Sequence, residues 1–124
     1  MIAILIMRLR VILLLINNTD SAIISGNITN SQAGSITINN SGLTVLYRKV
    51  TNSGAGKINI TNNDKGNFQS AIDNDATSTG MITLNNEGTV NSKITNQNTG
   101  AIKIINNGTI NGSINQYRYS KSGW

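Results

Sequence analysis

The stretch that decides the fold is GAIKIINNGTINGSINQ, residues Gly100 to Gln116. In its first half, Ile102 and Ile104 alternate with other residues and are followed by Asn106. In its second half, Ile110, Gly112, Ile114 and Gln116 repeat that alternation. Because successive side chains of a strand point to opposite faces, each half predicts a short strand whose aliphatic and amide side chains share one face.

Weaker copies of both strands recur toward the N-terminus. The first pattern starts at Ile36, Ile58, Ile82 and Ile102, at intervals of 22, 24 and 20 residues. The second pattern starts at Ile24, Leu46, Phe68, Val90 and Ile110, at intervals of 22, 22, 22 and 20 residues. Only the corners change in length, which is typical of a stacked solenoid. The sequence predicts an all-β fold, a parallel β-helix of about four to five coils with a period of about 22 residues and two strands per coil.

We divide the 124 residues into three parts: an apolar N-terminal segment at 1–12, solenoid repeats at 13–116 and a non-repeat tail at 117–124.

Three interpretations of the first apolar run, MIAILIMRLRVILLLI, compete. Arg8 and Arg10 interrupt it, and it is shorter than the roughly twenty residues of a membrane-spanning helix, so we do not predict one. A signal peptide starting at Met7 has a short apolar region. The third interpretation is a strand or cap over the first coil, which we favour for residues 13–18 and leave open for residues 1–11.

Asparagines end both strands in the same phase as the isoleucines, so stacking would place them in columns. Side-chain amides in such columns can bond to one another and to corner backbone that would otherwise be buried without partners. We predict two structural ladders rather than a ligand site. They comprise Asn40, Asn62, Asn86 and Asn106 after the first strand, and Asn30, Asn52, Asn74 and Asn96 after the second.

The composition of the chain disfavours metal binding, cofactor binding, nucleic-acid binding and catalysis. The chain has no Cys or His, and its net charge of +5 comes from scattered Lys and Arg. We therefore expect no metal, no cofactor and no nucleic-acid partner. Asp73 and Asp75 flank Asn74 and are expected to point outward; paired carboxylates can act as acid and base in polysaccharide cleavage, but solvated turn residues are the commoner case. We predict no catalytic residues and no enzyme.

One position breaks the repeat. Where other copies have Gly26, Ser70, Ser92 or Gly112, the second copy has Arg48. A buried unpaired Arg is costly, so we expect a bulge or a shifted register through residues 44–47. Tyr47, Arg48 and Lys49 then form either a candidate contact patch or the edge of a distortion.

The repeats at Gly80 to Asn96 and Gly100 to Asn115, reading GxIxIxNxG followed by TVNSKITN or TINGSIN, resemble the passenger-domain repeats of bacterial autotransporter adhesins and vacuolating-cytotoxin-like proteins. The resemblance covers roughly residues 14–116. It implies a secreted or outer-membrane-displayed structural or adhesion module whose partners are a host surface or a glycan. Two alternatives stay open: a truncated remnant of a longer adhesin without independent function, and a carbohydrate-binding or carbohydrate-cleaving β-helix. Because solenoid ends carry open backbone groups, we also expect self-association through uncapped ends.

Overall fold

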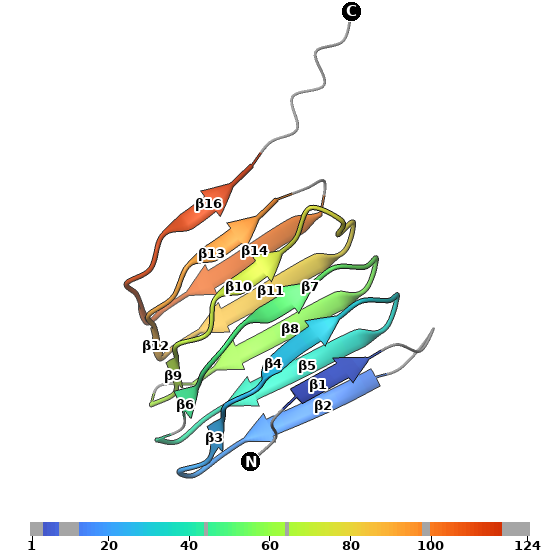
Figure 1. Cartoon of the computed structure of the whole chain (residues 1–124). Helices are drawn as coiled ribbons and strands as arrows, with labels where there is room; N and C mark the ends of the chain where they lie inside the picture. The colour runs from blue at the N-terminus through green and yellow to red at the C-terminus, as the bar shows by residue number, and fades with distance from the viewer. Residues whose placement is uncertain (1–3, 8–12, 44, 64, 98–99, 118–124) are drawn as a thin grey trace, which may run out of the picture.

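The structure is a computed structural model that describes residues 4–7, 13–43, 45–63, 65–97 and 100–117. Every regular element in this part of the chain is a strand, and all strand pairs are parallel. Successive coils stack in one direction, from β1 and β2 at one end to β16 at the other (Figure 1). The stack makes about four turns with a period near 22 residues, which confirms the predicted parallel β-solenoid.

Three sheets run along the stack. The wide sheet contains β2 (Leu13–Asn18), β5 (Ser35–Asn40), β8 (Lys57–Asn62), β11 (Met81–Asn86) and β14 (Ala101–Asn106). The narrow sheet contains β3 (Ile23–Ile24), β6 (Val45–Leu46), β9 (Asn67–Phe68), β12 (Thr89–Val90) and β15 (Thr109–Ile110). The third sheet contains β1 (Ile4–Met7), β4 (Asn27–Asn30), β7 (Val50–Asn52), β10 (Ile72–Asn74), β13 (Ile94–Asn96) and β16 (Ile114–Gln116).

The prediction of two strands per coil was wrong, because the second predicted strand bends into two. The bend falls at the small residue between its aliphatics, such as Ser92 between Val90 and Ile94. At this position the coils approach closely: the Ser92 hydroxyl donates to the Ser70 carbonyl oxygen, and a Cβ on Gly112 would collide with the Ser92 carbonyl oxygen. Small residues at this corner thus allow a third side to the coil.

Arg48 occupies this corner in the second coil and adopts a left-handed backbone conformation, with φ of 78°. The side chain is exposed, so no charge is buried. The expected register shift is absent: Leu46 of β6 pairs with Ile24 below and Phe68 above, as the repeat requires. The positive φ of Arg48 turns its long side chain out of the stack, and Thr44, which the same expectation included, lies outside the described residues.

The N-terminal apolar segment contributes a strand to the solenoid. Strand β1 pairs with β4 in parallel register, from Ile4 opposite Asn27 to Met7 opposite Asn30. The sheet therefore extends past the boundary that we placed between residues 12 and 13. Residues 8–12, with Arg8 and Arg10, and the tail at 118–124 lie outside the described residues. Among the described residues, no helix is long and apolar enough to cross a bilayer.

The core is a set of aliphatic columns closed by stacking. The wide sheet contributes Ile36, Ile58 and Ile82 in one column, each 0% exposed, and the third sheet contributes Val50, Ile72 and Ile94 in another. Phe68 fills the middle of the stack from the narrow sheet. Parallel neighbours lie about 4.8 Å apart, so each aliphatic side chain is covered by its counterparts in the adjacent coils.

Gly80, at the entrance to β11, lies where two coils touch through their backbones. A Cβ at this position would overlap the Gly56 carbonyl oxygen and lie 2.7 Å from Asn52 Nδ2. We expect Gly80→Ala to lower the free energy of unfolding by about 1–3 kcal/mol through this overpacking. Urea denaturation followed by circular dichroism measures the change. Thr79→Ala, at the exposed neighbouring residue, is the control, and equal stability of the two variants would refute the close approach.

Candidate functional site

The inward amides of the wide sheet form one hydrogen-bonded chain along the stack. The Nδ2 group of each donates to Oδ1 of the next, at 2.8 Å in all four steps from Asn18 through Asn40, Asn62 and Asn86 to Asn106. Asn62 Nδ2 also donates to the corner carbonyl oxygens of Gly66 and Thr89. The column therefore joins the coils to one another and satisfies the backbone of the bends.

The third-sheet column has the same design with one interruption. Asn52 donates to Asn74 at 3.1 Å, Asn74 to Asn96 at 2.8 Å and Asn96 to Gln116 at 3.0 Å. Asn30 instead donates to the Gly34 carbonyl oxygen, and Oδ1 of both Asn30 and Asn52 has no hydrogen-bond partner among the described residues. All of these amides except Asn106 and Gln116, in the last coil, are buried inside the stack and not available to a ligand, so we place the candidate site elsewhere.

The outward face of the third sheet carries three parallel columns, because its strands are in register. The first column holds the residues directly before β7, β10 and β13, which are Lys49, Ala71 and Lys93. The centre column holds Thr51, Asp73 and Thr95. The residue after the inward amide forms the last column, with Asp75, Gln97 and Tyr117. Nine positions from four successive coils are thus brought into one small grid.

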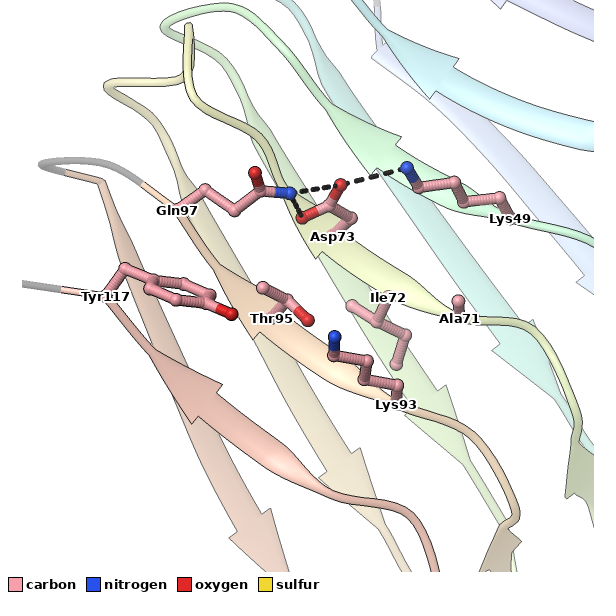
Figure 2. A pocket seen from close by; sticks show the side chains of 8 residues that line it. All are labelled: Lys49, Ala71, Ile72, Asp73, Lys93, Thr95, Gln97 and Tyr117. Atoms are coloured by element: carbon pink, nitrogen blue, oxygen red, sulfur yellow. Dashed lines mark hydrogen bonds and ion pairs between the residues drawn. The ribbon is translucent and has the colours of Figure 1, made fainter.

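A hollow of about 290 Å³ opens in this grid around Asp73. Its lining comprises Lys49, Ala71, Ile72, Asp73, Lys93, Thr95, Gln97 and Tyr117 (Figure 2). Ala71 stands between two lysines of its column, and its single methyl group leaves the space that a longer side chain would fill. The hollow is therefore a local consequence of one small residue in an otherwise regular face.

Asp73 is the electrostatic centre of the hollow. Its Oδ2 lies 2.9 Å from Lys49 Nζ, and Gln97 Nε2 donates to Oδ1 at 2.8 Å and to Oδ2 at 2.9 Å. These partners come from the coils on either side: Lys49 directly precedes β7, and Gln97 directly follows β13 (Figure 2). They cover the carboxylate so well that its side chain is 6% exposed, against 52% for Lys49. The expectation of a solvated Asp73 was wrong, because cross-coil partners enclose an outward side chain.

The opposite side of the hollow carries groups that are available to bind. Thr95 is largely buried, at 7% exposed, and its hydroxyl makes no hydrogen bond with the described part of the chain. Tyr117 is 55% exposed, and its phenol ring is directed toward Thr95 across the hollow (Figure 2). Lys93 is exposed and makes no ion pair with any described residue. A cation, a hydroxyl and an aromatic ring therefore face one space.

The predicted contact patch divides in the structure. Tyr47 and Arg48 are exposed at the corner before β7, whereas the Lys49 side chain reaches Asp73. We did not predict from the sequence that one hollow would be lined by Ala71, Lys93, Gln97 and Tyr117. A signal was present, because intervals of 22, 22 and 20 residues place Lys49 with Ala71 and Lys93, and Gln97 with Tyr117.

Asp75 lies in the same outward column but has a different role. Burial raises the pKa of its carboxyl, but hydrogen bonds from the Ser53 hydroxyl and from the hydroxyl and amide of Thr77, with the charge of Lys49, bring the pKa below its usual value. Ser53 Oγ donates at 2.6 Å from the coil below, and Thr77 N donates at 2.8 Å within the corner. The carboxylate thus fixes the lengthened corner between β10 and β11.

We expect Asp75→Asn to lower stability in a pH-dependent way. A lowered folded-state pKa stabilises the fold fully above the ordinary aspartate pKa of about 3.9, and this contribution is lost as pH falls through the lower value. Urea midpoints for the native chain and the variant should therefore differ at pH 6 and converge toward pH 2.5. A difference that stays constant over that range would show that the charged form of Asp75 is not what holds the corner.

Among the described residues, no three His, Cys, Asp or Glu side chains gather in a way that could hold a metal ion. Comparisons of the chain with profiles of known protein families, with curated proteins and with solved structures find no match. The candidate site therefore rests on its own geometry. What that geometry can do is bind a ligand noncovalently, through charge, hydrogen bonds and an aromatic surface on residues that lie in or directly beside paired strands.

Proposed function

We propose that the chain is a surface-exposed or secreted structural and adhesion module that works by noncovalent binding. The observation that carries the proposal is the outward grid of the third sheet, where side chains from four coils converge on a hollow. Asp73 and Thr95 lie in strands, and Lys93, Gln97 and Tyr117 lie directly beside strand ends. Groups positioned by strands keep their geometry better than groups on long loops, which favours recognition without a conformational change. The resemblance of the repeats to autotransporter passenger domains agrees with a role at a cell surface.

The architecture supports such a role mechanically. Each coil is joined to the next by ladder hydrogen bonds and by amide columns, so a load applied to the face is shared by several strands. The outward columns of the wide sheet are polar for most of their length, with residues such as Thr37, Asn59 and Thr83 in successive positions. Such a face has few of the apolar contacts that would drive face-to-face association, and it remains available to a partner.

A bead-attachment assay tests this function. Beads coated with the chain are washed over cultured epithelial cells under flow, and attached beads are counted. We expect several-fold more attachment than for beads coated with the Ile82→Asp variant, which has the same composition apart from one residue but a disrupted core. Equal attachment of the two coatings would show that binding does not depend on the fold and would contradict the proposal. The absence of attachment by either would favour a remnant without independent function.

The proposed location has its own test. Antibody raised against the chain should label intact producing cells, or recover the chain from their medium, without permeabilisation. Labelling that requires permeabilised cells would exclude surface display and secretion.

A further inference from the structure

The hollow of the third sheet combines features that together define a ligand class. It has one cation without an ion-pair partner and one hydroxyl without a hydrogen-bond partner among the described residues, together with one enclosed carboxylate, one amide and one exposed aromatic ring. We infer that it binds a carboxylate-bearing sugar residue, such as a uronic acid. This inference rests on the proposed binding function and names the ligand class for that same hollow.

Charge in the hollow indicates an anionic group on the ligand. Asp73 is neutralised by Lys49 at 2.9 Å and capped by Gln97, so this pair carries no net charge. Lys93 lies two coils from Lys49 in the same column, on the far side of Ala71, and adds one positive charge. A ligand carboxylate that enters beside Ala71 would meet the Lys93 ammonium, and a charge-assisted hydrogen bond of this kind is stronger than a neutral one.

Hydrogen-bonding groups around the hollow suit a ligand with several hydroxyls. Gln97 uses its Nε2 group on Asp73, which leaves its carbonyl oxygen Oε1 as an acceptor that points away from the carboxylate (Figure 2). Thr95 Oγ1 can both donate and accept. Asp73 Oδ1 and Oδ2 each retain acceptor capacity beyond the bonds they already receive. Because Asp73 and Thr95 lie in neighbouring strands and Gln97 directly follows one of them, these groups can contact adjacent hydroxyls of one sugar ring.

Size and shape separate a sugar from a simple anion. A hollow of about 290 Å³ is near the lower end of the range for small-molecule sites, and a phosphate or sulfate would leave most of it unfilled. Tyr117 offers a flat apolar ring at the rim, next to the polar groups. The C–H face of a pyranose can lie on such a ring while the hydroxyls at its edge reach the polar groups, an arrangement that an inorganic anion cannot use.

The test is an NMR titration of the full chain, labelled with nitrogen-15. The probes are trigalacturonic acid, its methyl ester and sodium phosphate. We expect the acid to shift the amide signals of Lys93, Thr95 and Gln97 in a saturable way. The ester should bind at least about tenfold more weakly, because it lacks the charge that meets Lys93. Equal affinity for acid and ester, or saturation by phosphate with the same shifts at the same concentration, would overturn the assignment.

Two variants locate the site. Lys93→Gln should weaken binding of the acid about tenfold while leaving the weak binding of the ester unchanged. Tyr117→Ala should weaken both, because it removes the ring that the sugar lies on. Lys103→Gln, which removes an exposed lysine from the wide sheet, is the control for net charge and should have no effect. Loss of affinity in the control equal to that in Lys93→Gln would place binding outside the hollow.

The titration tests the ligand class and the bead assay tests the adhesive function, so either proposal can be rejected without the other. Attachment of beads without uronate binding would reject the ligand class and retain the adhesive function. Uronate binding without attachment would retain the site and reject adhesion.

Discussion

Ile82→Asp is expected to unfold the chain. Ile82 is 0% exposed in the wide sheet, paired in register with Ile58 below and Ile102 above. An aspartate here would place a charge between two aliphatic side chains with no described cation within the core to pair with it. We expect the free energy of unfolding to fall by at least about 4 kcal/mol, a large part of the stability of a typical domain. Loss of the β-sheet circular dichroism spectrum at 25 °C would report it.

Thr83→Asp is the matched control, one residue further along the same strand. Thr83 lies on the outward face, opposite Asn59 and Lys103, so the new carboxylate would meet solvent and a cation. Its effect should be within about 0.5 kcal/mol. If Thr83→Asp destabilised the chain as much as Ile82→Asp, the assignment of the two faces of β11 would be wrong.

Asn62→Leu is expected to have the second largest effect, although it adds apolar surface to a buried position. Asn62 Nδ2 donates to Asn86 Oδ1 at 2.8 Å and to the Gly66 and Thr89 carbonyl oxygens, and its Oδ1 accepts from Asn40 at 2.8 Å. Leucine has a similar size but would leave two or three buried polar groups without these bonds. At about 1–3 kcal/mol for each such group, we expect a loss of about 3–5 kcal/mol.

The control for this change is Asn59→Leu, the same substitution on the exposed face of the same strand. Guanidinium denaturation of both variants should show a large loss of stability for Asn62→Leu alone. A stable Asn62→Leu variant would mean that the amide column fills space and that its hydrogen bonds are dispensable.

The sequence was sufficient to predict the stacking because the spacing inside each strand is repeated without change. Ile36, Ile38 and Asn40 recur with constant separation, so only one register places every isoleucine column inward. A shift of one residue would turn each column toward solvent. The same logic placed the asparagine columns, since they share the phase of the isoleucines.

The third side of the coil could not be read from periodicity alone. Val90 and Ile94 point inward whether the segment is one continuous strand or two short strands joined at a bend. The alternation of residues therefore does not distinguish these two structures. The deciding feature is close backbone contact between coils at Ser92 and Gly112, a property of stacking that one coil does not reveal. Likewise, β1 lacks the amide and corner residues that mark later coils, because Met7 stands where they have asparagine.

The hollow was not predicted because it too depends on contacts between neighbouring coils. Asp73 was assigned from its neighbours in sequence, Asn74 and Asp75, as an outward and therefore solvated group. Its actual environment comes from Lys49 and Gln97, each 24 residues away along the chain. Exposure on a solenoid depends on the columns beside a residue, which emerge only when the outward positions of successive coils are compared.

Parallel, in-register stacking creates both the core and the outward hollow, and nuclear Overhauser contacts between isoleucine methyl groups test it directly. With carbon-13 labels on the isoleucine δ1 methyls, the structure predicts strong cross-peaks between Ile36 and Ile58 and between Ile38 and Ile60. It also predicts one between Ile58 and Ile82 across the lengthened corner. Stronger cross-peaks from Ile36 to Ile60 and from Ile38 to Ile58 would indicate antiparallel pairing and would contradict the solenoid, together with the outward hollow that its register creates.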